Sequence, residues 1–242
     1  MRASRTPEHS LRFVLLSICC TVLPALAAQE GPIRVLLVTG GHEHELSFYE
    51  MFSGRAGYAI TVNPHPRAFR PWLSKRADVL VLYDMADVTD EAERKYLRAF
   101  LESGKGMVVL HHAIASNQQW PWWYEEVVGG RYVLKAEGGA PASSYKHDVD
   151  FEVRPAASHP VLEGVGPFRI PDEAYKNLWI SPKVKVLLET ANPENDKALA
   201  WISPYPKSRG VYVQLGHGSD AHGNPAYRRL LHNAIGWAAG RR

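Results

Sequence analysis

The chain alternates short apolar runs with stretches in which hydrophobic residues recur at helical spacing. Four apolar runs, each bounded by glycine, proline or polar residues, lie at positions 33–39, 78–83, 106–110 and 210–215. Short bounded runs of this kind are typical of strands buried on both faces, as in a parallel sheet. An amphipathic helix capped by Thr89 or Asp90 follows the second run, and another closes the chain from Pro225. These patterns predict strand–helix units around one core.

The middle of the chain has a different pattern. Residues 148–153 and 183–188 alternate between apolar and polar positions, and residues 198–202 are typical of a further strand. Residues 135–144 are rich in Gly, Ala and Ser and predict an exposed loop. Strand–helix alternation followed by a strand-rich section predicts an α/β sandwich whose core sheet is mostly parallel, with a β-rich insertion.

The start of the chain has the pattern of a secretion signal. Arg2, Arg5 and Arg12 precede an apolar stretch at positions 13–26, and Ala25-Leu-Ala27 is a small-residue cleavage pattern. The apolar stretch is shorter than the roughly 20 residues that a membrane-spanning helix needs. We therefore expect residues 1–27 to be a cleaved signal peptide, and residues 28–242 to form one domain, periplasmic or secreted and not held in a membrane.

Removal of this leader changes the chemistry of the chain in two ways. Cys19 and Cys20 both lie within it, so the mature domain is expected to have no disulfide and no thiol chemistry. The leader also holds three arginines and one glutamate of the 28 basic and 25 acidic residues, which leaves the domain nearly neutral. The sequence has no stripe of basic residues of the kind that would indicate a nucleic-acid partner.

Titratable side chains follow several of the predicted strands. In open α/β sheets, ligands sit beyond the carboxyl ends of the strands, so these side chains are expected to share one edge. The candidate acid–base residues are His111, His112, His217 and Glu173, the last lying in the strand-rich section. The candidate substrate-binding residues are His44, Asp84, Trp122, Asp172, Asp220 and His222. The candidate ligands of a divalent metal, zinc or manganese, are His42, His112 and His217.

Each of these interpretations has a structural alternative. The histidines could form a solvated polar rim that is satisfied by backbone carbonyls, and no HExxH or CxxC pattern supports a metal. The aromatic run at 120–124 could stack on sugar rings through Trp122, or pack a short helix onto the sheet. So many titratable groups at one predicted edge favour a functional cleft over a polar rim.

Four segments resemble the ThuA-like (trehalose utilisation) family. They are LLVTGGHEHE near the start, GKGMVVLHHA in the middle, DEAY at 172–175 and the ending YVQLGHGSDAHGNPAYRRLLHNAIGWAAG. The resemblance implies a flavodoxin-like three-layer sandwich similar to class I glutamine amidotransferase domains. His111 and His112 stand where those enzymes carry their nucleophile, so the resemblance implies a role in sugar utilisation and not glutamine amidotransfer.

Two functional hypotheses follow from the resemblance and the predicted cleft. The first is an exported enzyme, a hydrolase or lyase that acts on glycosides or keto-sugars through a histidine and carboxylate cleft. The second is a sugar-binding protein of the same fold without catalysis. Both have a small-molecule carbohydrate as the partner, and the sequence leaves the oligomeric state open.

Overall fold

The computed structural model describes Met1 and residues 31–241, so the expected leader and its cleavage site lie outside the described residues. Strands and helices alternate through the first half of this region, with η1 and η3 as 3₁₀ helices and η2 as a π-helix. In chain order they are β1 (Ile33–Gly40), α1 (Ser47–Glu50), β2 (Tyr58–Val62), α2 (Leu73–Arg76), β3 (Val79–Asp84), α3 (Glu91–Glu102), β4 (Gly106–Leu110), η1 (His111–Ala115), η2 (Trp122–Val128), β5 (Gly130–Arg131), β6 (Ser144–Pro155), η3 (Pro160–Leu162), β7 (Phe168–Lys176), β8 (Trp179–Ile180), β9 (Lys185–Glu189), β10 (Ala198–Ile202), β11 (Gly210–Val213), α4 (Ser219–Gly223) and α5 (Pro225–Ala238).

The four apolar runs form the centre of one nine-stranded sheet, in the order β2-β1-β3-β4-β11-β10-β9-β6-β7. Strands β2, β1, β3, β4 and β11 run parallel to one another, so their carboxyl ends meet at one edge. Every residue of β3, β4 and β11 is buried, as expected for strands covered on both faces. The predicted mixed α/β fold with a large, mostly parallel central sheet is confirmed.

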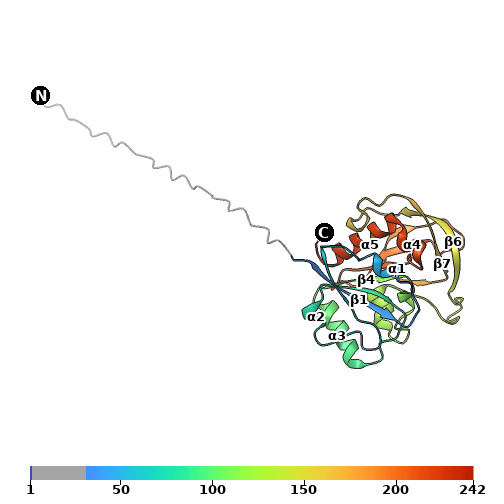
Figure 1. The fold of residues 1–242 in the computed structure, drawn as a ribbon, viewed down its shortest axis with the longest axis horizontal. Helices are drawn as coiled ribbons and strands as arrows, with labels where there is room; N and C mark the ends of the chain where they lie inside the picture. The colour runs from blue at the N-terminus through green and yellow to red at the C-terminus, as the bar shows by residue number, and fades with distance from the viewer. Residues whose placement is uncertain (2–30, 242) are drawn as a thin grey trace. The chain divides into compact units, whose positions relative to one another are not determined.

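Helices cover both faces of this parallel part. Helices α2 and α3 lie on one face, and α1, α4 and α5 lie on the other (Figure 1). Alternate residues of β1 point to the two faces: Leu36 belongs to the buried cluster that contains Leu97 of α3, and Leu37 belongs to the cluster that contains Leu231 of α5. The side chains of Asp90 and Asn224 accept hydrogen bonds from the first backbone N–H groups of α3 and α5, so both predicted helix caps are confirmed.

The strand-rich section extends the same sheet with antiparallel strands. Strand β10 pairs with β11 and β9, β9 pairs with β6, and β6 pairs with β7, all antiparallel. Strand β7, which includes the Asp172–Tyr175 segment, was not predicted as a strand. Strand β7 brings Glu173 to His111 and His217, which follow β4 and β11, and β6 brings His147 to Glu173. Among residues 31–241, no helix is both long and apolar enough to cross a membrane.

Candidate functional site

His111 occupies the turn between strand β4 and helix η1. Its φ is 49°, a left-handed conformation that costs a non-glycine residue about 1 kcal/mol or more and is concentrated at functional sites. The hydroxyl of Tyr212 donates to its backbone oxygen at 3.2 Å, and its Nδ1 lies 2.6 Å from the carbonyl oxygen of Gln214. Since a carbonyl only accepts, Nδ1 is the protonated ring nitrogen. In the neutral ring, this leaves the lone pair of Nε2 facing Glu173, His217 and Tyr175.

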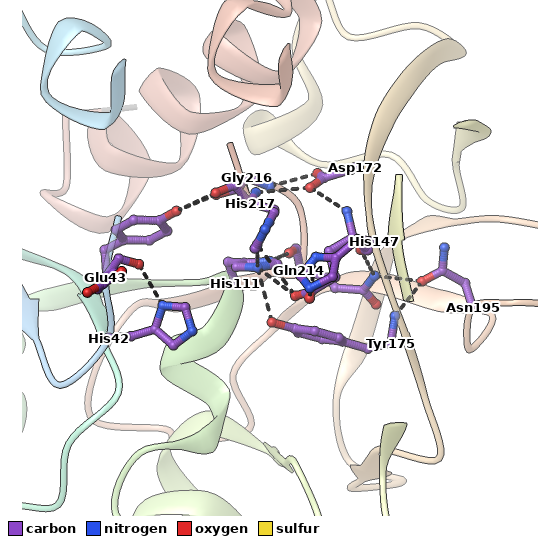
Figure 2. Close-up of polar contacts among 12 residues, drawn as sticks. His42, Glu43, His111, His147, Asp172, Tyr175, Asn195, Gln214, Gly216 and His217 are labelled. Carbon is purple, nitrogen blue, oxygen red and sulfur yellow. Dashed lines mark hydrogen bonds and ion pairs between the residues drawn. The ribbon is translucent and has the colours of Figure 1, made fainter. Parts of the chain in front are cut away.

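Three side chains converge on this Nε2 atom. Glu173 Oε2 lies 3.1 Å away, His217 Nδ1 lies 3.2 Å away and the hydroxyl oxygen of Tyr175 lies 3.1 Å away. His217 Nδ1 and Glu173 Oε2 are themselves 3.6 Å apart. Figure 2 shows the rings of His111 and His217 directed toward one another, with the Tyr175 hydroxyl beneath. His111, Glu173 and His217 form a group whose ligand atoms all lie within 4.8 Å of one another.

Asp172 holds the loop that carries His217. Its carboxylate accepts hydrogen bonds from the backbone N–H groups of Glu173, Gly216 and His217 at 2.8, 2.8 and 2.9 Å. Burial raises the pKa of Asp172, and these three donors partly offset that effect. Gly216 has a φ of 116°, and a Cβ there would overlap the hydroxyl of Tyr227, so only glycine fits this turn. Asp172 thus fixes His217 relative to Glu173.

His147 reaches the group from strand β6. The pairing of β6 with β7 shifts register between Lys146 and Val149, where Asp148 has a φ of 57°. A bulge of this kind re-aims a side chain, and here His147 Nδ1 lies 3.1 Å from Glu173 Oε1. Each oxygen of the Glu173 carboxylate therefore has its own imidazole partner, Oε2 with His111 and Oε1 with His147.

Local electrostatics favour an ionised Glu173 carboxylate beside a neutral His217 ring. Burial favours the neutral form of Glu173, but the hydrogen bond and charge that His111 supplies when protonated, the charge of His217 and the Tyr175 hydroxyl outweigh it and lower the pKa of Glu173. Burial and the neighbouring His111 lower the pKa of His217, against the opposing effect of Glu173. At neutral pH the group thus offers a carboxylate and a neutral ring, which are the protonation states that bind metals.

The group lies at the base of a cavity of about 410 Å³. This volume is within the range of roughly 300–1,000 Å³ that is typical of small-molecule sites. The cavity is lined by His42, Met85, His111, His112, Ala115, Tyr132, Leu134, Tyr145, His147, Glu173, Tyr175 and His217. The predicted cleft at the carboxyl edge of the sheet is therefore present, with His42, His111, His112, His217 and Glu173 in its wall.

His112 and His42 form a separate pair in that wall. Their rings stack with centroids 4.6 Å apart. Burial, together with the nearby His111 and His42, lowers the pKa of His112 to about 2, so this ring stays neutral. Its Nε2 atom is buried without a hydrogen-bond partner. The predicted metal set of His42, His112 and His217 therefore differs from the set that the structure brings together, because β7 places Glu173 beside His111 instead.

None of the six predicted substrate-binding residues is among those that line the cavity. Asp84 is buried against His65 at 3.0 Å, and His222 is buried against Ser47 at 2.8 Å. His44 hydrogen-bonds the hydroxyl of Tyr49 at 2.9 Å, Asp220 is exposed on α4, and Asp172 acts on the His217 loop. Trp122 lies under Arg98, whose guanidinium is 3.8 Å from the ring centroid, so the packing interpretation of the aromatic run is the one that the structure supports.

The sequence reasoning missed seven of the lining residues. They are Met85, Ala115, Tyr132, Leu134, Tyr145, His147 and Tyr175. Tyr175 lay within the family-like segment at 172–175, which is a signal that could have identified it. His147 had no such signal, because its direction depends on the β6 bulge.

Two other buried histidines predict how the stability of the domain depends on pH. Burial lowers the pKa of His222 to about 4 and that of His232 to about 4. In the unfolded chain each ring takes up a proton near its ordinary pKa of about 6.5, whereas the folded domain resists protonation until about pH 4. The unfolded state therefore binds more protons in this window, and stability is full above about pH 7 and falls as the pH is lowered toward 4.

We expect the melting temperature to drop by several degrees between pH 7 and pH 5. Differential scanning calorimetry at constant ionic strength measures this drop. The variant His232→Gln removes one of the two rings and should show a shallower decline. A decline that is unchanged in this variant would contradict the assignment of His232.

Comparisons with known proteins agree with this fold. The family model for ThuA, described as trehalose utilisation, matches residues 34–238. A ThuA-like protein from Parabacteroides merdae has a similar structure, with a TM-score of 0.70, 20% identity, and coverage of 86% of this chain and 90% of that one. A ThuA-like protein from Bacteroides uniformis has a TM-score of 0.67, 20% identity, and coverage of 89% and 95%.

The same fold also occurs within larger proteins. A β-galactosidase from Bacillus circulans sp. alkalophilus matches 84% of this chain with 31% of its own, at 10% identity and a TM-score of 0.55. A search of curated proteins gives no match. The match of the family model over nearly all of the described domain shows that this chain belongs to the ThuA family, which links it to carbohydrate utilisation.

Proposed function

We propose that this protein is an enzyme that processes keto-sugars, with His111, Glu173 and His217 holding a divalent metal ion at the base of the cavity. The observation that carries the proposal is the triangle formed by His111 Nε2, Glu173 Oε2 and His217 Nδ1, with sides of 3.1, 3.2 and 3.6 Å. Two imidazoles and one carboxylate are a ligand set of catalytic zinc sites.

The spacing of this triangle fits a metal ion. Ligands at 2.0–2.1 Å in a tetrahedral arrangement are separated by about 3.4 Å. When His111 is neutral, the lone pair of its Nε2 faces the ionised oxygen of Glu173, so a cation between them would relieve a repulsion. His111 also donates its other ring N–H to the Gln214 carbonyl, an arrangement that orients metal-binding histidines. When bound, such an ion polarises a carbonyl oxygen of the substrate.

His147 is suited to move a proton beside this centre. Its Nδ1 is held by Glu173 Oε1 at 3.1 Å, which leaves Nε2 free of that contact, and half of its side chain is exposed. A carboxylate that orients an imidazole in this way is the usual arrangement of a general base. We propose that His147 removes the proton from the carbon next to the sugar carbonyl. The electron pair of that C–H bond forms a C=C bond as the glycosidic C–O bond on the next carbon breaks, and the proton then passes to the departing oxygen.

The carboxylates favour this chemistry over direct glycoside displacement. Inverting and retaining glycosidases use two carboxyl groups that face each other across the scissile bond. In the part of the chain that the structure describes, Glu173 is the only carboxylate in the cavity wall. One base beside one cation is sufficient for proton removal next to a carbonyl. His112, neutral and with an unpartnered Nε2, is placed to accept a hydrogen bond from a sugar hydroxyl.

A sugar-binding protein without catalysis remains the second candidate, supported by the same cavity. The leader-like start of the sequence supports a place of action in the periplasm or outside the cell. Both candidates share a small carbohydrate as ligand and differ only in turnover.

The test is a metal assay on the purified domain, followed by a screen of glycosides and their 3-keto forms. We expect about one zinc or manganese ion per chain and release of the aglycone from the keto forms alone. His147→Gln should abolish release of the aglycone while metal content is retained. Tight sugar binding without any turnover would support the binding protein, and the absence of both metal and turnover would contradict the proposed enzyme.

A further inference from the structure

The mouth of the cavity differs in chemistry from its base. Three of the exposed large apolar side chains in the described domain line this one cavity: Leu134 and Tyr145, each 60% exposed, and Met85, 38% exposed. The base, by contrast, is formed by the buried His111, Glu173 and Tyr175. A gathering of exposed apolar side chains beside a polar site marks a surface that a ligand covers.

The segments that carry this mouth are anchored. Val133 N–H donates to Ser143 Oγ at 2.8 Å, and Ser143 N–H donates to the Val133 carbonyl oxygen at 2.8 Å. Ser143 Oγ donates in turn to the carbonyl oxygen of Asn177 at 2.7 Å. These hydrogen bonds hold Val133 in place, and Leu134 follows it directly in the chain. Tyr145 packs edge-on against His147 with centroids 5.1 Å apart, which places it next to the polar cluster.

We infer that the mouth is a subsite for an aromatic aglycone, so that the substrate class is aryl glycosides. This inference rests on the proposed function, because the glycosyl ring then occupies the base. A second sugar ring would need several partners for its hydroxyls. At the mouth only the phenol hydroxyls of Tyr132 and Tyr145 are available, because no cavity-lining residue of the described domain carries an amide, guanidinium or ammonium group. Met85, Leu134, Tyr132 and Tyr145 instead offer apolar contact and an aromatic edge.

The cavity is large enough for both parts. Its volume of about 410 Å³ exceeds what one pyranose ring fills, and the exposed Met85, Leu134 and Tyr145 line the same cavity as the polar cluster. Because Leu134 and Tyr145 are each 60% exposed, truncating them removes little buried surface and tests binding more than stability.

The experiment compares phenyl with methyl β-D-glucopyranoside, and the 3-keto forms of both, by calorimetric titration. We expect the phenyl member of at least one pair to bind about tenfold more tightly, with a more negative heat-capacity change. The double variant Leu134→Ala/Tyr145→Ala should lose about this tenfold for the phenyl ligand and leave the methyl ligand within about twofold. Tyr145→Phe, which keeps the ring, should retain the preference.

Leu46→Ala is the matched control, since Leu46 is 78% exposed but does not line the cavity. Equal affinity within both pairs, or no binding of any of the four ligands, overturns the inference. Trehalose binding more tightly than either phenyl ligand overturns it in favour of a second sugar ring. A domain that prefers phenyl ligands but contains no metal and releases no aglycone would contradict the proposed function while leaving the aglycone subsite supported.

Discussion

Glu173→Gln is expected to reduce metal affinity at least about 100-fold and to abolish turnover, while the domain stays folded. The change keeps the size of the side chain but removes the negative charge that faces His111 and His217 at 3.1 and 3.6 Å. Mutating a residue that only hydrogen-bonds a metal ligand typically reduces metal affinity about 10–100-fold. Removing the charge of a ligand itself should reduce the affinity more. Metal content by mass spectrometry and turnover of keto-glycosides are the measurements.

A comparison of histidine variants separates the two possible ligand sets. His217→Ala should lower metal occupancy in either case, because His217 belongs to both sets. His112→Ala should leave occupancy unchanged if His111, Glu173 and His217 are the ligands, although it weakens sugar binding. Glu50→Gln, on an exposed residue of α1, is the control for loss of one carboxylate. Full metal content and activity in Glu173→Gln would refute the proposed centre.

Asp172→Ala is expected to lower the free energy of unfolding by about 3–5 kcal/mol. The buried carboxylate accepts from three backbone N–H groups, and each buried donor left without a partner costs about 1–3 kcal/mol. The His217 loop should also lose its position, so metal affinity falls together with stability. Asp172→Asn should cost less, because its amide oxygen still accepts a hydrogen bond.

Urea denaturation followed by circular dichroism measures this loss. Asp150→Ala is the matched control, because Asp150 lies on the neighbouring strand and forms an exposed ion pair with Arg169 at 2.7 Å. Exposed pairs of this kind contribute about 1 kcal/mol or less. A loss for Asp172→Ala no greater than that for Asp150→Ala would show that other groups hold the loop.

The parallel half of the fold could be predicted because its strands are buried on both faces. Burial on both faces leaves uninterrupted apolar runs, and several of these strands are followed by histidines at a known edge. Strand β7 lacks this signature. It carries the consecutive acids Asp172 and Glu173, and both are buried because one caps the His217 loop while the other meets His111. Strand prediction relies on apolar runs or on alternation of apolar and polar residues, and two consecutive buried acids fit neither pattern.

The candidate site was predicted in part for the same reason. His111, His217 and Glu173 were expected to share a cavity, and they do, since two of them follow core strands. The choice of metal ligands depended on how far the antiparallel strands bend over the edge, which is a long-range property. His147 depended on the register shift in β6. Trp122 could not be assigned to core or cavity because an aromatic residue suits both environments equally.

The junction between the parallel and antiparallel halves of the sheet has a consequence for how the domain assembles. His111 follows a parallel strand, whereas Glu173 and His147 come from the antiparallel extension, at separations along the chain of tens of residues. Contacts so distant in sequence form late, since the entropy of closing long loops must be overcome first. A chain with only one half folded therefore lacks the triangle of donor atoms. An ion that binds there would bind only the fully folded domain, so its binding free energy would add to the stability of the contact between the two halves.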